Sequence, residues 1–446
     1  MEIFVKAVSL IMSLSILVLL HELGHFIPAR LFKTKVEKFY LFFDPWFSLF
    51  KYKKGDTEYG IGWIPLGGYV KIAGMIDESM DKEAMKEEPK PWEFRSKPAW
   101  QRLIIMLGGV TVNALLAWGI YIMILFVWGK EEMPLANATN GLEPSNVMKS
   151  YGFKSGDKVI DVDGVAPYEI QDISLEILLN EKRKVTVERA GKPVTIYLPV
   201  DLDQEIMKSK EKSLFEIRIP FYVDSVMQDS SLGAMKSGIQ KNDQIVGINA
   251  KPTPFYQDFK SEIEKNKGKT VAVTVLRNSD TLVFNSAVSA DGFLGVQASG
   301  YSKFFTTVKH EYGFFEAIPA GMDLATDKLV GYVKQFKLVF TAEGANNVGG
   351  PIAMGRLFPS SYDENYWVSF WNLTALLSVI LAFMNLLPIP ALDGGHVVFL
   401  LYEIIFRKKP GDKFMEYAQM VGMILLLSLM AFAFFNDIRN FVWNLF

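Results

Sequence analysis

Residues 19–26 read LLHELGHF, and they overlap the end of an uncharged run of 14 residues, from Ala7 to Leu20. On a helix, residues four apart lie on one face, so His21 and His25 can bind one metal ion together. Glu22 would then lie within reach of a metal-bound water. The alternative, two helix histidines lining a polar crevice, leaves a carboxylate in lipid without a function. The stretch therefore predicts a hydrolytic metal site at the end of an apolar helix.

The composition narrows the choice of metal and of partners. The chain has 446 residues and no cysteine, so a metal site must use His, Asp or Glu. Zinc accepts such nitrogen and oxygen ligands and keeps an open position in catalytic sites, so we expect Zn2+ as the cofactor. The 47 Lys and Arg residues balance 49 Asp and Glu, and this balance predicts no nucleic-acid partner.

Three further charge-free runs are long enough to cross a bilayer, which takes about 20 mostly apolar residues. They are Leu103–Gly129, Tyr366–Leu392 and Tyr417–Asn436. The N-terminal run has the length of a signal-peptide core, but no small-residue cleavage site follows it and helix-compatible sequence continues to Leu31. We therefore expect a multi-pass α-helical membrane protein, inserted in a lipid bilayer by four transmembrane helices at residues 1–32, 100–129, 366–393 and 415–436.

Basic residues predict the orientation of these helices, because cytoplasmic loops carry an excess of Lys and Arg. The loop at 33–99 begins and ends with basic residues, and the short loop before the last helix contains Arg407, Lys408, Lys409 and Lys413. Both loops are expected to be cytoplasmic. The long segment between the second and third helices is then external.

The external segment contains a repeat. GFKSGDKVIDVDGVAP begins at Gly152, and GIQKNDQIVGINAKPT begins at Gly238, 86 residues further along. Each copy is followed by two alternating strands joined by a turn, which is typical of a hairpin. The pattern resembles PDZ domains, which bind extended peptides at a sheet edge. We expect two β-rich PDZ-like domains at residues 136–201 and 215–290, followed by an external amphipathic linker at 303–362.

A third metal ligand is needed, and NLLPIPALDGGH at residues 385–396 offers two candidates. Pro388 and Pro390 break the third helix, and irregular backbone at membrane depth is tolerated where it lines a cavity. A carboxylate in this position, Asp393, is a functional candidate. His396 is the alternative, although two glycines place it further along the chain. His310 lies in the external segment, on the wrong side of the membrane.

HELGH and NLLPIPALDGG resemble the two signatures of the site-2 protease family of intramembrane metalloproteases. IPLGGYVK at 64–71, GGVTVN at 108–113 and GGPIAM at 349–354 extend the resemblance. It implies that zinc is bound by His21, His25 and Asp393, and that Glu22 is the general base. It also implies two substrate-binding elements: Asn385, and a membrane-associated β-hairpin region within 33–99 that includes Gly67, Gly68 and Tyr69.

The resemblance implies cleavage of a transmembrane segment in a single-pass membrane protein. The expected substrate is an anti-sigma factor already trimmed outside, in an envelope stress response, with remnant signal peptides as further substrates. The expected location is the bacterial inner membrane, with the PDZ-like domains in the periplasm and the active site near the cytoplasmic side.

Two other functions fit the sequence less well. A membrane scaffold without activity would present the tandem PDZ-like domains but would not need the buried His, Glu and Asp. A membrane-anchored zinc protease for soluble proteins would need a third ligand in a soluble domain near the HELGH motif, and the 33–99 loop has no histidine.

Overall fold

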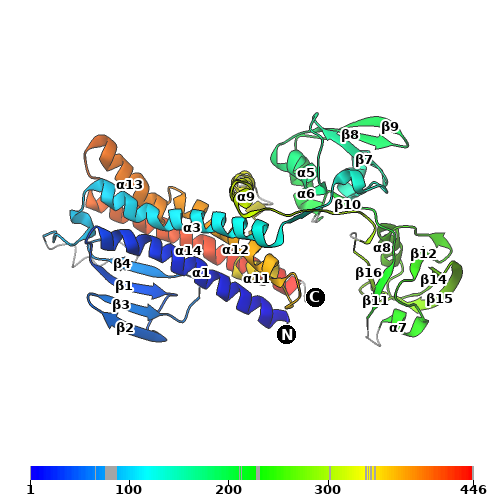
Figure 1. Cartoon of the computed structure of the whole chain (residues 1–446), viewed down its shortest axis with the longest axis horizontal. Helices are drawn as coiled ribbons and strands as arrows, with labels where there is room; N and C mark the ends of the chain where they lie inside the picture. Colours follow the sequence, from blue (N-terminus) through cyan, green and yellow to red (C-terminus); the bar gives the residue numbers. More distant parts are fainter. Residues whose placement is uncertain are drawn as a thin grey trace. The chain divides into compact units, whose positions relative to one another are not determined.

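The computed structural model describes residues 2–65, 67–75, 88–209, 211, 213–227, 232–300, 303–336, 339, 341, 344–345 and 348–443 (Figure 1). The chain forms two compact units. One unit combines Met1–Gly129 with Glu311–Phe446, and the other is Lys130–His310. The first unit contains the apolar helices and the motifs, and the second contains the repeat.

Among the described residues, four helices are long and apolar enough to cross a membrane, as predicted. They are α1 (Glu2–Leu31), α3 (Ala99–Trp128), α12 (Tyr366–Leu386) and α14 (Asp412–Trp443). The predicted range 366–393 was wrong at its end. Leu387 is extended, with φ −60° and ψ 143°, because a residue before proline is pushed out of the α region. Asp393 instead begins a separate helix, α13 (Asp393–Phe406).

Helix α3 is the centre of the first unit. It contacts α1, α12, α13 and α9 (Phe314–Phe336), and α1 and α3 run side by side in Figure 1. The approach to α1 is closest at two glycines. A Cβ on Gly108 would lie 1.9 Å from the carbonyl oxygen of Gly24, and a Cβ on Gly24 would lie 2.4 Å from that of Gly108. Small residues allow such close contact between helices in a membrane, where dispersion forces replace the hydrophobic effect.

The predicted hairpin region forms a four-stranded sheet. Its strands are β1 (Val36–Leu41), β2 (Phe50–Lys54), β3 (Thr57–Ile61) and β4 (Tyr69–Ile72), in the order β2-β3-β1-β4. β2 and β3 form an antiparallel hairpin, but β1 and β3 are parallel, so the region is one sheet rather than a series of hairpins. Within the described residues β4 is an edge strand, and both β1 and β4 contact α1.

The second unit contains two β-rich halves with separate hydrophobic cores. The first half has β7 (Lys158–Val162), β8 (Lys184–Arg189) and β9 (Lys192–Tyr197) in one sheet. The second half has a sheet in the order β13-β12-β14-β15. Its strands are β12 (Gln244–Ile248), β13 (Lys251–Pro252), β14 (Thr270–Arg277) and β15 (Asp280–Ala287).

The terminal strands do not follow the expected ranges 136–201 and 215–290. β10 (Phe215–Ile217) pairs with β6 (Leu142–Pro144), and Phe215 belongs to the core of the first half. β16 (Val296–Ala298), beyond residue 290, pairs with β11 (Val223–Val226) of the second half. The repeated sequence covers only the middle of each half, so it does not show where these outer strands belong.

One ion pair occurs at the same place in both halves. Arg189 forms a bidentate pair with Asp157, at 2.8 and 2.7 Å, and Arg277 forms one with Asp243, at 2.7 Å for both bonds. Each arginine also donates to the carbonyl of the glycine that begins its repeat. The aspartates are buried, so these pairs satisfy charges that would otherwise be costly. The similarity in sequence therefore reflects a shared structural contact.

The contact between Gly24 and Gly108 predicts the effect of one methyl group. Gly108→Ala should force α1 and α3 apart and lower the free energy of unfolding by about 1–3 kcal/mol, the usual cost of overpacking. Thermal unfolding in detergent, followed by circular dichroism, measures the change. Gly119→Ala on the same helix is the matched control, because nothing lies within 4 Å of a Cβ there. Equal stability of the two variants would show that the helices tolerate the extra carbon.

Candidate metal centre

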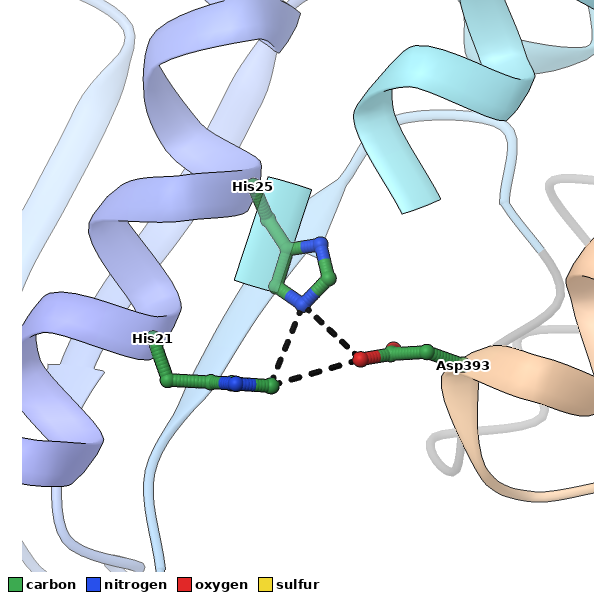
Figure 2. Close-up of side chains that lie close together, drawn as sticks. All are labelled: His21, His25 and Asp393. Carbon is green, nitrogen blue, oxygen red and sulfur yellow. Dashed lines mark hydrogen bonds and ion pairs between the residues drawn. The ribbon is translucent and has the colours of Figure 1, made fainter. Parts of the chain in front are cut away.

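His21 and His25 lie one turn apart on α1 and point to one side of it (Figure 2). Their Nε2 atoms are 3.2 Å apart, and the rings meet edge to face with centroids separated by 4.9 Å. His25 is buried and His21 is partly buried. The helix thus brings two ligand nitrogens together, as their spacing predicts.

Asp393 approaches the two histidines from α13. Its Oδ2 atom lies 3.4 Å from Nε2 of His21 and 3.3 Å from Nε2 of His25. These three residues form the one group of potential metal ligands found in the described part of the chain. His396, the alternative ligand, is not a member of the group although it lies on the same helix.

The loop before Asp393 is folded tightly against the first turn of α13. A Cβ on Gly394 would lie 2.2 Å from the carbonyl oxygen of Leu387, and one on Gly395 would lie 2.6 Å from that of Ile389. Ala391 has a φ of +88°, which is strained for a residue with a side chain. Its N–H donates to Oε1 of Gln419 on α14, at 3.1 Å. The two glycines after Asp393 are therefore required by close packing of the backbone.

Helix α13 is also attached to α3 by an ion pair. Arg102 donates to Oε1 of Glu403 at 2.6 Å, and both side chains are largely buried. Val397 and Leu400 of α13 pack in the same cluster as Ile105 of α3. These contacts fix α13 on the helix that also packs against α1, and so hold Asp393 opposite the histidines.

The three ligand atoms fit a zinc ion. Ligands bound to tetrahedral zinc at about 2.0–2.1 Å lie about 3.3 Å from each other, and the separations found here are 3.2, 3.3 and 3.4 Å. Oδ2 of Asp393 is buried and accepts no hydrogen bond of normal geometry from the described residues. The outer nitrogen of His25, Nδ1, lies 2.8 Å from the carbonyl oxygen of Ile105 and must donate to it. Its Nε2 therefore presents a lone pair to the centre.

Gly109 makes room for both imidazoles. A Cβ at this position would lie 2.4 Å from Nε2 of His25 and 2.5 Å from Cε1 of His21. Gly109 was not among the residues predicted to lie at the site. The signal for it was the GGVTVN motif in an apolar helix, which indicates close helix packing but does not indicate its partner.

The other predicted site residues lie either near α1 and the start of β4 or at the end of α12. Glu22 is buried beside His21, and a Cβ on Gly68 would lie 3.5 Å from its Cγ. Gly68 therefore brings the start of β4 close to the carboxylate. A Cβ on Gly67 would meet the ring of Phe43 at 2.7 Å. Asn385 is partly buried, one residue before the end of α12.

The phenol of Tyr69 already has a partner. It donates to Oδ1 of Asp44 at 2.9 Å and stacks on Tyr40, with ring centroids 5.3 Å apart. Burial and the nearby carboxylate raise the pKa of Tyr69, so the phenol remains a donor at neutral pH. What β4 can offer a substrate is its backbone edge.

Comparison with known proteins agrees with this geometry. The sequence profile described as "Peptidase family M50" matches residues 9–429. The chain belongs to peptidase family M50. It is a zinc metalloprotease of the site-2 type and a membrane protein.

Several relatives are similar to this M50 protease over nearly their whole length. A "Regulator of sigma E protease" of Haemophilus influenzae is 29% identical over 456 residues, covering 96% of this chain and 97% of the relative. "Protease RseP" of Yersinia pestis is 28% identical, with 98% and 99% covered. A "Regulator of sigma-E protease RseP" of Salmonella typhimurium is also 28% identical, with 96% and 97% covered.

The position of Gly109 leads to a prediction about metal binding. In Gly109→Ala the new methyl group should displace both imidazoles and weaken zinc binding by about tenfold or more, the range reported for disturbed ligand orientation. Competition with a chelator of known affinity measures the change in the purified protein. Gly119→Ala should bind zinc like the parent. Unchanged affinity in Gly109→Ala would mean that the histidines do not bind the metal from the positions found here.

Proposed function

We propose that this M50 protease hydrolyses peptide bonds within transmembrane segments, with His21, His25 and Asp393 as the zinc ligands and Glu22 as the general base. The observation that supports the proposal most directly is the set of three mutual distances of 3.2–3.4 Å between nitrogen and oxygen ligand atoms. These atoms belong to two helices of an apolar unit.

A zinc ion held by these residues supplies Lewis-acid polarisation of the scissile carbonyl and activation of the attacking water. Glu22 accepts the proton of that water on a carboxylate oxygen and passes it to the nitrogen of the leaving amine. Glu22 is buried beside His21. This supports its role as a base, because a buried site keeps bulk water away from the carboxylate. Asp393 contributes a negative charge that balances part of the charge of the metal.

The basic loops favour a site near the cytoplasmic side of an inner membrane. Arg30 lies in the last turn of the helix that carries the HELGH motif, Lys33 and Lys35 follow that helix, and Arg407 to Lys409 follow α13. Since basic loops remain in the cytoplasm, the ends of α1 and α13 that bear these residues belong there. The Lys130–His310 unit is then on the periplasmic side.

The edge of β4 supports recognition of an extended substrate. A transmembrane helix cannot be cut as it stands, because its carbonyls are already hydrogen-bonded internally. We infer that the substrate unwinds next to the metal centre and pairs with the outer edge of β4, which is an edge strand within the described residues, near Gly68 and Tyr69. Asn385 at the end of α12 then supplies a further side-chain hydrogen bond to the substrate backbone.

The names of the relatives support a substrate that itself takes part in regulation. All three relatives described above are named as regulators of sigma E or as RseP. A single-pass anti-sigma factor, trimmed outside before its membrane segment is cut during an envelope stress response, is therefore the proposed substrate class. Remnant signal peptides have the same form, a short apolar helix without a folded external part.

Substitutions at Glu22 and Asp393 separate the two roles. Glu22→Gln should keep one zinc per chain but cleave at no more than about one per cent of the parent rate, because loss of a general base costs about 100-fold or more. Asp393→Asn should bind zinc more weakly. Zinc content and cleavage of a single-pass substrate are measured on the same preparations, with Glu2→Gln on the same helix as the matched control.

Two outcomes would contradict this assignment. One is an active Glu22→Gln variant. The other is full zinc content and full rate in Asp393→Asn together with loss of both in His396→Ala, which would make His396 the third ligand.

The Lys130–His310 unit is proposed to act as a size filter composed of two PDZ-like domains. β5 (Lys130–Glu132) and β17 (Val308–His310) are paired antiparallel, with Glu132 opposite Val308. Residues 133–307 can therefore be replaced by an Asn-Gly turn that closes this two-stranded ladder. If the unit excludes bulky external domains, the variant should cleave untrimmed substrates that the parent spares, and trimmed substrates at the parent rate.

Cleavage of matched trimmed and untrimmed substrates by zinc-loaded, membrane-inserted protein measures the effect. Slower cleavage of trimmed substrates would instead indicate that the unit recruits them by gripping a peptide end. Continued sparing of every untrimmed substrate would reject the filter.

A further inference from the structure

Asn113 of α3 is the polar side chain next to the outer nitrogen of His21. It is fully buried, and its Nδ2 atom lies 3.1 Å from Nδ1 of His21. Its Oδ1 atom is also buried, and no described residue forms a hydrogen bond with it. A buried amide oxygen without a partner costs about 1–3 kcal/mol, so this arrangement requires an explanation.

Asn113 belongs to a row of three α3 residues that face the two histidines. Ile105, Gly109 and Asn113 follow at intervals of four and so lie on one face of the helix. Ile105 accepts from Nδ1 of His25, Gly109 leaves space for both rings, and Asn113 meets Nδ1 of His21. Helix α3 therefore contacts the outer nitrogen of each histidine while the inner nitrogens face Asp393.

The metal site requires a particular tautomer of His21. Nε2 of His21 faces Nε2 of His25 and Oδ2 of Asp393, so it can bind a cation only if it carries a lone pair. A neutral imidazole then carries its proton on Nδ1. An amide N–H directed at Nδ1 would stabilise the opposite tautomer and place a proton at the centre of the site.

We propose that Asn113 is a positioning residue that turns its Oδ1 atom to Nδ1 of His21 and accepts the Nδ1–H proton. A rotation of 180° about the last side-chain torsion exchanges the two ends of the amide, and the hydrogen-bond network decides which end faces a partner. In this orientation the oxygen gains a donor and Nε2 keeps its lone pair for the metal. The inference rests on the proposed zinc ligation by His21.

The position of Asn113 is held by a contact with a third helix. The hydroxyl of Ser378 on α12 donates to the backbone carbonyl of Asn113 at 2.7 Å, and both residues are fully buried. Asn113 is thus hydrogen-bonded to α12 through its backbone carbonyl, and its side-chain amide points to α1. A side chain anchored in this way can fix the ring of His21 as well as its tautomer.

The affinity for Zn2+ of three variants tests the inference in the full-length protein. Asn113→Leu has a similar size and no acceptor, so its affinity should fall by about 10- to 100-fold, the usual effect of removing such a partner. Asn113→Asp keeps an acceptor and loses the donor, so its affinity should remain within about threefold of the parent. Thr111→Val, two residues away on the same helix and exposed in the structure, is the matched control.

Competition with a chelator at pH 8 gives the affinities, and size-exclusion chromatography checks folding. If Asn113→Asp loses affinity as Asn113→Leu does, the amide acts as a donor and the inference is wrong. It is also wrong if Asn113→Leu binds like the parent. Should Asn113→Leu fail to fold, the comparison of Asn113→Asp with the parent still decides the orientation.

The same assay separates this inference from the proposed function. A parent protein that binds one zinc, lost in His21→Ala, supports the ligand assignment whatever the Asn113 variants do. A parent that retains its zinc in His21→Ala rejects the ligand assignment, and the role of Asn113 is rejected with it.

Discussion

The site depends on the direct contact between the backbones of α1 and α3 at Gly24 and Gly108. Between helices in lipid there is little hydrophobic driving force, so dispersion contacts over a close interface hold them together. Because no side chain separates the helices here, the imidazoles of α1 come within hydrogen-bond reach of α3, at the carbonyl of Ile105. Gly109, next in sequence, provides the space that the rings occupy. One packing arrangement therefore both joins the helices and shapes the candidate metal site.

The position of Asp393, the proposed third ligand, depends on a second backbone contact, within the chain segment that breaks α12. Pro388 and Pro390 end the regular helix, and the loop folds back so closely that Gly394 and Gly395 cannot bear side chains. Gln419 of α14 pairs with the strained Ala391 in this loop. Freed backbone groups at membrane depth must find partners in the protein, since lipid offers none. The irregular loop is therefore tolerated because it packs against protein. It places the carboxylate of Asp393 at the first residue of a new helix, α13.

Features of local origin could be predicted from the sequence, and features of long-range origin could not. The helical spacing of His21 and His25 and the charge-free runs of the four helices depend on neighbouring residues, which the sequence displays directly. Asp393 could be proposed because two prolines interrupt the helix just before a carboxylate at membrane depth, and because the motif resembles that of the site-2 protease family. The parallel pairing of β1 with β3 and the pairing of β10 with β6 join distant segments, for which no local pattern exists. The contact of Asn113 with His21 is of the same kind, since 92 residues separate them.

Polar residues on two inward-facing sides of α1 explain how a water-using site can lie in an apolar helix. Ser9 and Ser13 of α1 lie four residues apart and share one face, and His21 and His25 share a second face, rotated from the first by about 120°. Ser9 pairs with Tyr366 of α12 at 2.8 Å, and Ser13 accepts from Thr374 of α12 at 3.0 Å. Such bonds contribute only about 0.6 kcal/mol each in a membrane, too little to determine stability. They do favour one rotation of α1, because other rotations would separate these hydroxyls from their partners on α12. The rotation that turns the two serines toward α12 also leaves His21 and His25 turned toward α3 and α13, so the proposed metal ligands contact protein and not lipid.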